Sequence, residues 1–320
     1  MMRPGVHYEW GRLCEAVVGT APADDIVVFH EDSQRWLEPA AAEFSRAHAG
    51  RRLVDVDAEF ARRIELQIEG LAALLQREGV TVHRPERLRE AERQFLAPLG
   101  EGLQLLARDP LIVVGNHAIE GSLRLQCRQR ERFGLRAIVQ RLAAAGMRWS
   151  SVPLGSPGAV DGPFLEGGDV LLNGHEVYVG MSGCASDLAG ADWLQALVGP
   201  AYRVIPVALR SNVLHLDWAL TLVRPGLLLH CPEKLIDGLP MSLRAWDKVV
   251  LSPAEAEQLQ VNILALDENR AVVEAGNERI IAELRRRRIE TIPLPFDAAR
   301  LFGGGLRSAC APLSREGAVA

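Results

Sequence analysis

A strand–turn–strand unit recurs along this chain, and the recurrence restricts the fold more than any other feature of the sequence. In the clearest copy, residues 169–180, two apolar runs flank Asn173-Gly174, and Asn-Gly between apolar runs is a strong hairpin signal. Similar pairs of apolar runs lie at 111–119, 219–230 and 262–274, and a fifth is expected to join 14–19 to 25–29. The sequence therefore predicts five hairpins.

Helical stretches and single strands separate these hairpins. Apolar residues recur at helical spacing in 58–79, 131–146 and 277–288. Short strands are expected after two of these helices, at 148–152 and 289–294. Hairpin–helix–strand units repeated along one chain favour a radial arrangement around a centre. An ordinary α/β sheet with hairpin insertions stays open as the alternative. No linker interrupts the chain, so residues 1–320 are expected to form one domain.

Composition and charge narrow the class of partner. The net charge is −5, and the basic run Arg285–Arg288 lies in a helical context that suits a solvated face, so a nucleic-acid partner is not expected. No apolar run approaches the roughly 20 residues of a membrane span, and no apolar run follows Met1–Gly5 as in a signal peptide. The five cysteines are dispersed, which fits a reducing, cytoplasmic setting. These features favour a small-molecule partner.

Two short polar segments stand where strands begin or end. In the first, Glu166 and Asp169 flank a pair of glycines that lets the backbone approach a ligand closely, although a plain turn explains it equally well. In the second, residues 214–218 are expected to form a strand in which His215 and Asp217 share one face. A histidine beside a carboxylate suits proton transfer or the binding of a cation.

The third polar segment, residues 302–313, has three consecutive glycines before Ser308 and Cys310, each a potential nucleophile. A flexible loop is the simpler explanation of the same residues. No cluster of His, Cys and carboxylates has metal-ligand spacing. Asp109 opens another hairpin, so Glu166, Asp109 and Asp217 would make an acidic cleft that suits a cation such as a guanidinium.

These segments, in this order, resemble the guanidino-group modifying (pentein) superfamily, and within it the arginine:glycine and inosamine-phosphate amidinotransferases. Residues 9–20 are similar to that family's opening strand, 108–120 to its second module and 262–270 to its last hairpin. Each motif is weak alone, but the ordered set covers nearly the whole chain. The resemblance implies an α/β propeller of five pseudo-symmetric ββαβ modules around a central cleft.

The resemblance also implies a mechanism. A cysteine after the glycine-rich turn attacks the guanidinium carbon and forms a covalent amidino-enzyme. His215 would move protons to the leaving amine and from the acceptor, and Glu166 would hold or share that proton. Asp109 and Asp217 would bind the guanidinium, with Gly167 and Arg307 also in the substrate site. No metal or organic cofactor is implied, and a homodimer is compatible with the resemblance.

The chain departs from the family at the nucleophile. Relatives read Gly-Gly-Gly-x-His/Arg-Cys-x-Thr/Ser, a register that puts Ser308 in the cysteine's place and Cys310 in the Thr/Ser position. A hydroxyl is a far poorer nucleophile than a thiolate near neutral pH. Three explanations are open: an inactivated Cys-to-Ser variant, a natural non-catalytic relative, or a shifted loop in which Cys310 attacks. The intact acid–base positions favour the first.

The resemblance predicts amidino transfer from arginine or a related guanidine to an amine, with specialised metabolism as one setting. Guanidine hydrolysis, as in a deiminase or dihydrolase, is the alternative within enzymes, because it shares the covalent intermediate. A guanidine-binding protein without catalysis is the alternative outside enzymes. Residues 180–186 lack the arginine with which deiminase-type relatives can hold a carboxylate. The substrate therefore need not be free arginine bound in the usual way.

Overall fold

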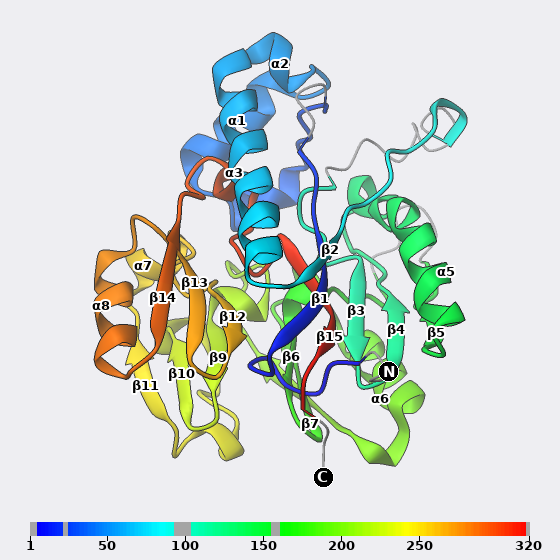
Figure 1. Ribbon diagram of the computed structural model, residues 1–320. Helices are drawn as coiled ribbons and strands as arrows, with labels where there is room; N and C mark the ends of the chain where they lie inside the picture. Colours follow the sequence, from blue (N-terminus) through cyan, green and yellow to red (C-terminus); the bar gives the residue numbers. More distant parts are fainter. Residues whose placement is uncertain (1–4, 22–24, 93–103, 155–160, 318–320) are drawn as a thin grey trace.

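The computed structural model describes residues 5–21, 25–92, 104–154 and 161–317. In these residues, five three-stranded sheets share one pattern: the first strand is antiparallel to the second, and the second is parallel to the third (Figure 1). The strands are β1 Leu13–Val18, β2 Thr81–His83, β3 Leu111–Val114, β4 His117–Glu120, β5 Arg148–Ser151, β6 Val170–Asn173, β7 Glu176–Met181, β8 Arg203–Ala208, β9 Leu220–Arg224, β10 Leu227–His230, β11 Asp247–Val250, β12 Leu264–Asp267, β13 Arg270–Glu274, β14 Glu290–Leu294 and β15 Cys310–Arg315. The expected five-module fold is confirmed.

Four of the sheets are continuous in sequence, in the orders β3-β4-β5, β6-β7-β8, β9-β10-β11 and β12-β13-β14. The fifth has the order β15-β1-β2, so its first strand comes from the C-terminal end of the chain. Val17 pairs with Ala311 on the antiparallel side of β1 and with His83 on the parallel side. The two ends of the chain therefore complete one module together.

Helices cover the outside of the sheets. α3 packs against β1, β2 and β14, α5 against β4 and β5, α6 against β8, and α8 against β11 and β14. The helices are α1 Pro39–His48, α2 Leu53–Val56, α3 Ala58–Arg77, α5 Arg136–Ala144, α6 Leu188–Val198, α7 Pro253–Glu257 and α8 Glu278–Arg286. No helix in the described part of the chain is both long and apolar enough to cross a membrane.

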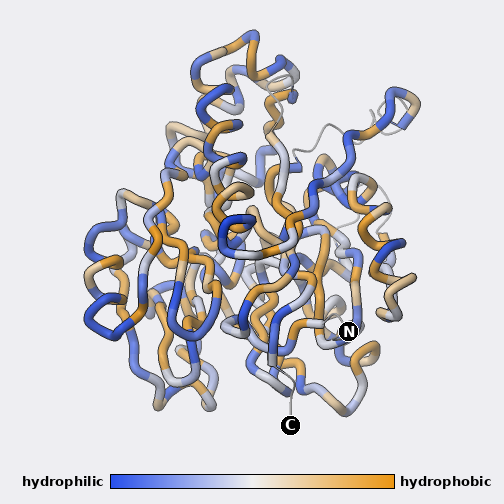
Figure 2. Tube along the Cα trace, in the orientation of Figure 1, coloured by the Kyte–Doolittle hydropathy of each residue, from blue (hydrophilic) through white to orange (hydrophobic). Residues whose placement is uncertain are grey.

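Local sequence signals set several of these boundaries. The side chain of Asp57 accepts a hydrogen bond from the amide of Phe60 and so caps the start of α3. Gly174 in the β6–β7 turn has a φ of +65°, a backbone conformation that glycine adopts without steric cost. Figure 2 shows apolar residues along the central strands and hydrophilic residues on the outer helices such as α8. The core thus lies between the sheets and their covering helices.

The segments that lead into the first strand of each sheet converge. β15 packs beside β3, and β12 beside both β9 and β1 (Figure 1). Two 3-10 turns, η5 Gly167–Asp169 before β6 and η7 Leu216–Trp218 before β9, lie against each other. Polar residues in five such lead-in segments can therefore meet at one place although they are far apart in sequence.

Two expected strands are absent. Residues 25–29 form only an isolated bridge, between Ile26 and Arg52. The reason is that β15 and β2 occupy both sides of β1, which leaves it no free edge for a hairpin partner. Residues 216–218 form the 3-10 turn η7 instead of a strand, with His215 at its N-cap position. The amide of Leu216 donates to Asp169 Oδ1 at 2.9 Å, which takes it away from any sheet ladder.

Candidate active site

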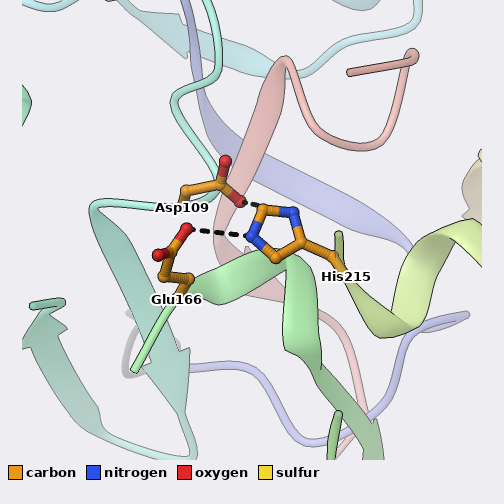
Figure 3. Close-up of side chains that lie close together, drawn as sticks. All are labelled: Asp109, Glu166 and His215. Atoms are coloured by element: carbon orange, nitrogen blue, oxygen red, sulfur yellow. Dashed lines mark hydrogen bonds and ion pairs between the residues drawn. The ribbon is translucent and has the colours of Figure 1, made fainter. Parts of the chain in front are cut away.

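A buried histidine between two carboxylates forms the centre of the site (Figure 3). His215 Nε2 donates to Glu166 Oε2 at 2.9 Å, and Nδ1 lies 3.8 Å from Asp109 Oδ1. The three residues come from the lead-in segments of β9, β6 and β3. Each of them is at most 2% exposed, so their charges interact with little screening by water.

These charges favour the protonated imidazole. Burial opposes a charged His215, but the carboxylates of Asp109, Glu166 and Asp169 outweigh it and raise the histidine pKa to about 10. Burial likewise opposes the charge on Asp109, whose pKa is nevertheless lowered by His215 and by the guanidinium of Arg128. His215 therefore carries a proton at neutral pH and can give it to a leaving group.

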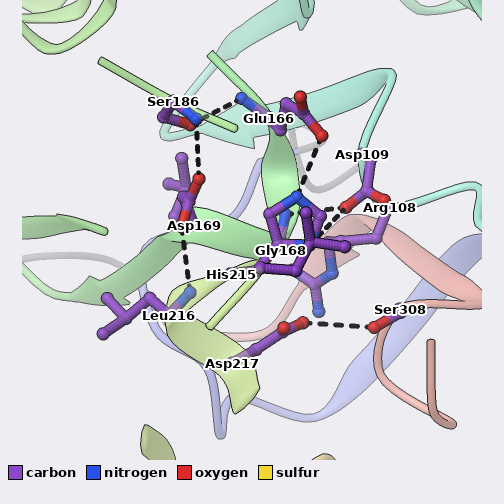
Figure 4. Close-up of polar contacts among 12 residues, drawn as sticks. Arg108, Asp109, Glu166, Gly168, Asp169, Ser186, His215, Leu216, Asp217 and Ser308 are labelled. Carbon is purple, nitrogen blue, oxygen red and sulfur yellow. Dashed lines mark hydrogen bonds and ion pairs between the residues drawn. The ribbon is translucent and has the colours of Figure 1, made fainter. Parts of the chain in front are cut away.

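Asp169 holds the two turns of the site together (Figure 4). Its carboxylate accepts from the amide of Leu216 at 2.9 Å and from the amide of Ser186 at 3.0 Å. The hydroxyl of Ser186 in turn accepts from the amide of Glu166 at 2.9 Å. Burial raises the pKa of Asp169 to about 7. These bonds fix the backbone on both sides of the His215–Glu166 contact.

A second polar group lies around Ser308, in the lead-in segment of β15. Ser308 Oγ donates to Asp217 Oδ2 at 3.3 Å (Figure 4). Asp217 Oδ2 also accepts from the guanidinium of Arg307 at 2.9 Å. Asp217 Oδ1 is buried and has no hydrogen-bond partner in the described structure. Burial raises the pKa of Asp217, and Arg307 only partly offsets this. A cationic donor group placed at Oδ1 would satisfy that oxygen.

Asn262, in the lead-in segment of β12, orients residue 308. Its Oδ1 accepts from the amides of Arg307 at 2.9 Å and Ser308 at 3.2 Å. Because both amides donate, the Nδ2 group must face the other way, where it donates to Ser308 Oγ at 3.0 Å and to the carbonyl of Asp217 at 3.3 Å. All five modules thus contribute a residue to the site.

The side chains of the site include a group that could coordinate a metal ion. Asp109, Glu166 and His215 each bring one ligand atom within 4.8 Å of the others, and they are the one such group found in the described residues. Two carboxylates and one imidazole can coordinate a divalent cation. In the structure, however, the cation that contacts both carboxylates is the guanidinium of Arg128. The geometry therefore favours an organic cation over a metal.

Comparisons with known proteins agree with this geometry. No model of a known protein family matches the sequence. The chain is 28% identical to inosamine-phosphate amidinotransferase 1 of Streptomyces griseus, with 97% of this chain and 96% of that protein covered. It is 27% identical to the L-arginine:L-lysine amidinotransferase of Pseudomonas savastanoi pv. phaseolicola, over 97% of this chain and 93% of that one.

Among solved structures, an inosamine-phosphate amidinotransferase of Streptomyces griseus superimposes with a TM-score of 0.81 and 26% identity, covering 99% of this chain and 98% of that one. Both sequence and fold therefore agree over the full length. The chain is therefore similar over nearly its full length to the amidinotransferase branch of the pentein superfamily. The resemblance inferred from the ordered motifs is confirmed.

The structure brings most of the predicted site residues together. Glu166, His215 and Asp109 are in contact, and Asp217 contacts Ser308. Whether these residues catalyse and bind as the sequence predicts stays a proposal, taken up below.

Three other predicted site residues are engaged with protein groups or buried in the core, and none of them faces a substrate directly. All the nitrogens of the Arg307 side chain donate to protein groups, namely Glu9, Asp217 and the carbonyl of Val170, so Arg307 acts on a substrate only through Asp217. Gly167 is buried with its amide donating to the carbonyl of Asp109. Cys310 lies in the apolar core, and burial raises its thiol pKa to about 11, which disfavours attack by its thiolate.

Sequence reasoning missed three polar residues of the site: Arg128, Glu131 and Asn262. The first two lie in the charged run 128–132, which has the composition of a solvated helix face. Asn262 opens the segment that resembles the family's last hairpin. Its position before the first strand of its module, where the other modules place Asp109, Glu166 and Asp217, is a signal that could have found it.

Proposed function

We propose that this chain catalyses the transfer of an amidino group from arginine or a related guanidine to an amine acceptor. The observation that carries the proposal is the protonated, buried His215 against Glu166, beside the Asp217–Ser308 pair, in a chain that matches amidinotransferases over its full length. A proton donor, carboxylates for a cation and a nucleophile position are the components that such a transfer needs.

The donor guanidinium would lie with its N–H groups against Asp217 Oδ1, which lacks a partner, and Asp109. Residue 308, after passing its proton to Asp217, would attack the guanidinium carbon, and the bond from that carbon to the donor's amine would break as His215 protonates the amine. The acceptor amine would then attack the amidino carbon, lose its proton to His215 and displace residue 308, which regains its proton from Asp217. The amidino group moves from donor to acceptor, and both proton carriers return to their starting state.

Ser308 limits this chemistry in the chain as it stands. Its hydroxyl must lose a proton to become a nucleophile, and the base it contacts is the carboxylate of Asp217 at 3.3 Å. A cysteine at the same place would supply a thiolate at far lower cost. The chain with Ser308 is accordingly a slow enzyme or a guanidine-binding protein, and Ser308 is the specific observation that favours the second candidate.

The test is to incubate the native protein and the Ser308→Cys variant with arginine and, separately, glycine, lysine or an inosamine phosphate. We expect ornithine and an amidinated acceptor in equal amounts, with the variant faster by at least about 100-fold. Ornithine without an amidinated acceptor, or citrulline with ammonia, would instead identify a hydrolase. If Ser308→Cys turns over none of them but binds guanidines, the non-catalytic function is correct.

The proposal treats residues 1–320 as one catalytic domain acting on small molecules. Its five cysteines are free, which fits the reducing cytoplasm. A homodimer stays a prediction of the resemblance, and sedimentation of the purified protein would test it.

A further inference from the structure

The side chain of Arg128 places a guanidinium of the chain itself in the proposed donor site. Its Nε and Nη2 donate to the two carboxylate oxygens of Glu131 at 2.7 and 2.9 Å. This side-on pairing is the bidentate geometry in which a guanidinium binds a carboxylate most strongly. The side chains are 13% and 2% exposed, so the pair lies almost entirely inside the protein.

The same guanidinium reaches the acid–base group. Arg128 Nη2 donates to Asp109 Oδ2 at 3.0 Å, and Nη1 lies 3.7 Å from Glu166 Oε2. Asp109 is the carboxylate proposed to bind the donor, and Glu166 is the partner of His215. Arg128 thus makes, from within the chain, the contacts that an arginine substrate would make from outside.

Two guanidinium groups cannot use these carboxylates at once. Both would need Asp109 Oδ2, and two cations a few ångströms apart in a buried site repel each other strongly. Exchange of one guanidinium for the other leaves the charge of the site unchanged. Removal of Arg128 without replacement would leave Asp109 and Glu166 with His215 as their counter-charge, and would leave Glu131 without its guanidinium partner.

Space for such an exchange lies next to the pair. Arg128 and Glu131 form part of the wall of a pocket with an empty volume of about 580 Å³, including its open mouth. The rest of the wall is largely apolar and includes Leu105, Leu106, Trp36 and Phe302. A pocket of this kind can accept the aliphatic stem of either Arg128 or a donor.

We infer that Arg128 is an affinity-determining residue of the donor site: its guanidinium, held by Glu131, competes with the guanidinium of the donor for Asp109. This inference rests on the proposed function. The apparent affinity for a donor is then reduced by the fraction of molecules in which Arg128 occupies the site. Arg128 and Glu131 act by competition and take no part in the chemical step.

The experiment measures binding of methylguanidine to the native full chain and to the double variant Arg128→Met/Glu131→Gln by isothermal titration calorimetry. The double variant removes the competitor and keeps the net charge, because it replaces both members of a buried ion pair. We expect its dissociation constant to fall by about 10- to 100-fold. Adding Asp109→Asn to the double variant should abolish the gain, since the ligand would lose the contested carboxylate.

The matched control is Arg287→Met/Glu283→Gln, which removes an Arg–Glu pair at the C-terminal end of the outer helix α8. This control should bind methylguanidine like the native chain. Unchanged or weaker binding by a folded Arg128→Met/Glu131→Gln protein would overturn the inference, because Arg128 would then not compete or would be needed for binding. If Ser308→Cys still forms an amidinated acceptor in that case, the proposed function stands and only the role of Arg128 is wrong.

Discussion

His215 shows how individual residues set the chemistry of this site. A histidine normally titrates near neutral pH, but three buried carboxylates raise its pKa to about 10. The imidazole is thus held in its protonated form at neutral pH. The same charges couple the protonation of His215 to the stability of the fold.

Stability should therefore fall as the pH rises from about 7 to 10. The folded state keeps the proton of His215 in this range, whereas the unfolded state releases it above its ordinary pKa, so raising the pH favours unfolding. The slope from this one group is at most about 1.4 kcal/mol per pH unit. Asp169, with a pKa of about 7, titrates at the lower edge of the window and, as the pH rises, lowers stability mainly below it. Urea unfolding followed by tryptophan fluorescence at several pH values measures the slope.

The control for this pH dependence is His215→Gln, which cannot titrate. It should be less stable than the native protein at pH 7, because it leaves the carboxylates without their counter-charge, and its stability should vary less up to pH 10. Equal slopes for the two proteins would show that His215 is not the group responsible.

Sequence alone predicted Glu166, His215, Asp217, Asp109 and Ser308, because each stands beside glycines, a hairpin start or another polar residue. It did not predict Arg128 and Glu131, since their role depends on contacts with Asp109 and Glu166, which lie 19 or more residues away. Nothing in a charged run reveals that one of its arginines turns inward. Pairing between distant segments is the information that the sequence lacks.

At the scale of single elements, the turns η5 and η7 position the site residues more directly than the strands that follow them. Four of the five expected hairpins could be predicted, because turn residues and apolar runs act locally. The turn at Leu216 could not, because it depends on Asp169 of another module accepting its amide hydrogen. Gly168 in η5 allows the close approach of the two segments.

Gly168→Ala should disable the acid–base pair. A Cβ at this position would lie 2.5 Å from His215 Nδ1 and 2.8 Å from Asp109 Oδ1, so the imidazole must move off Glu166. Measured in the Ser308→Cys background, turnover should fall at least about 100-fold, and the free energy of unfolding by about 1–3 kcal/mol.

Gly70→Ala in α3 is the matched control, because its new Cβ would meet Leu294 at an ordinary 3.8 Å. It should keep full turnover and gain roughly 0.5–1 kcal/mol of stability, since alanine favours a helix. Full turnover by Gly168→Ala would contradict the assigned geometry of the site.

At the scale of the whole molecule, the sheet β15-β1-β2 closes the circle of modules. The amide of Arg315 donates to the carbonyl of Gly5 at 2.9 Å, so the two terminal segments run side by side (Figure 1). Sequence repetition predicted five modules but assigned the wrong partner to β1, because β15 lies about 300 residues away. Local sequence signals favour a hairpin partner that is close in sequence.

A circular permutant should therefore fold. Residues 5 and 316 would be joined by a short Gly/Ser linker, and the chain opened between Pro225 and Gly226, an exposed turn between β9 and β10. Circular dichroism should show native secondary structure, and methylguanidine binding should persist. A permutant opened between Gly167 and Gly168, inside the site, should lose binding. Failure of the first permutant to fold would contradict the closure.

Closure by β15 has a consequence for biosynthesis. On the ribosome, β1 is made long before its antiparallel partner β15, so this edge of β1 stays unpaired until β15 has been synthesised. The lead-in segment with Ser308 arrives together with β15. A nascent chain thus has no complete site until β15 has been made, and a product truncated before β15 would display an open strand edge that invites aggregation.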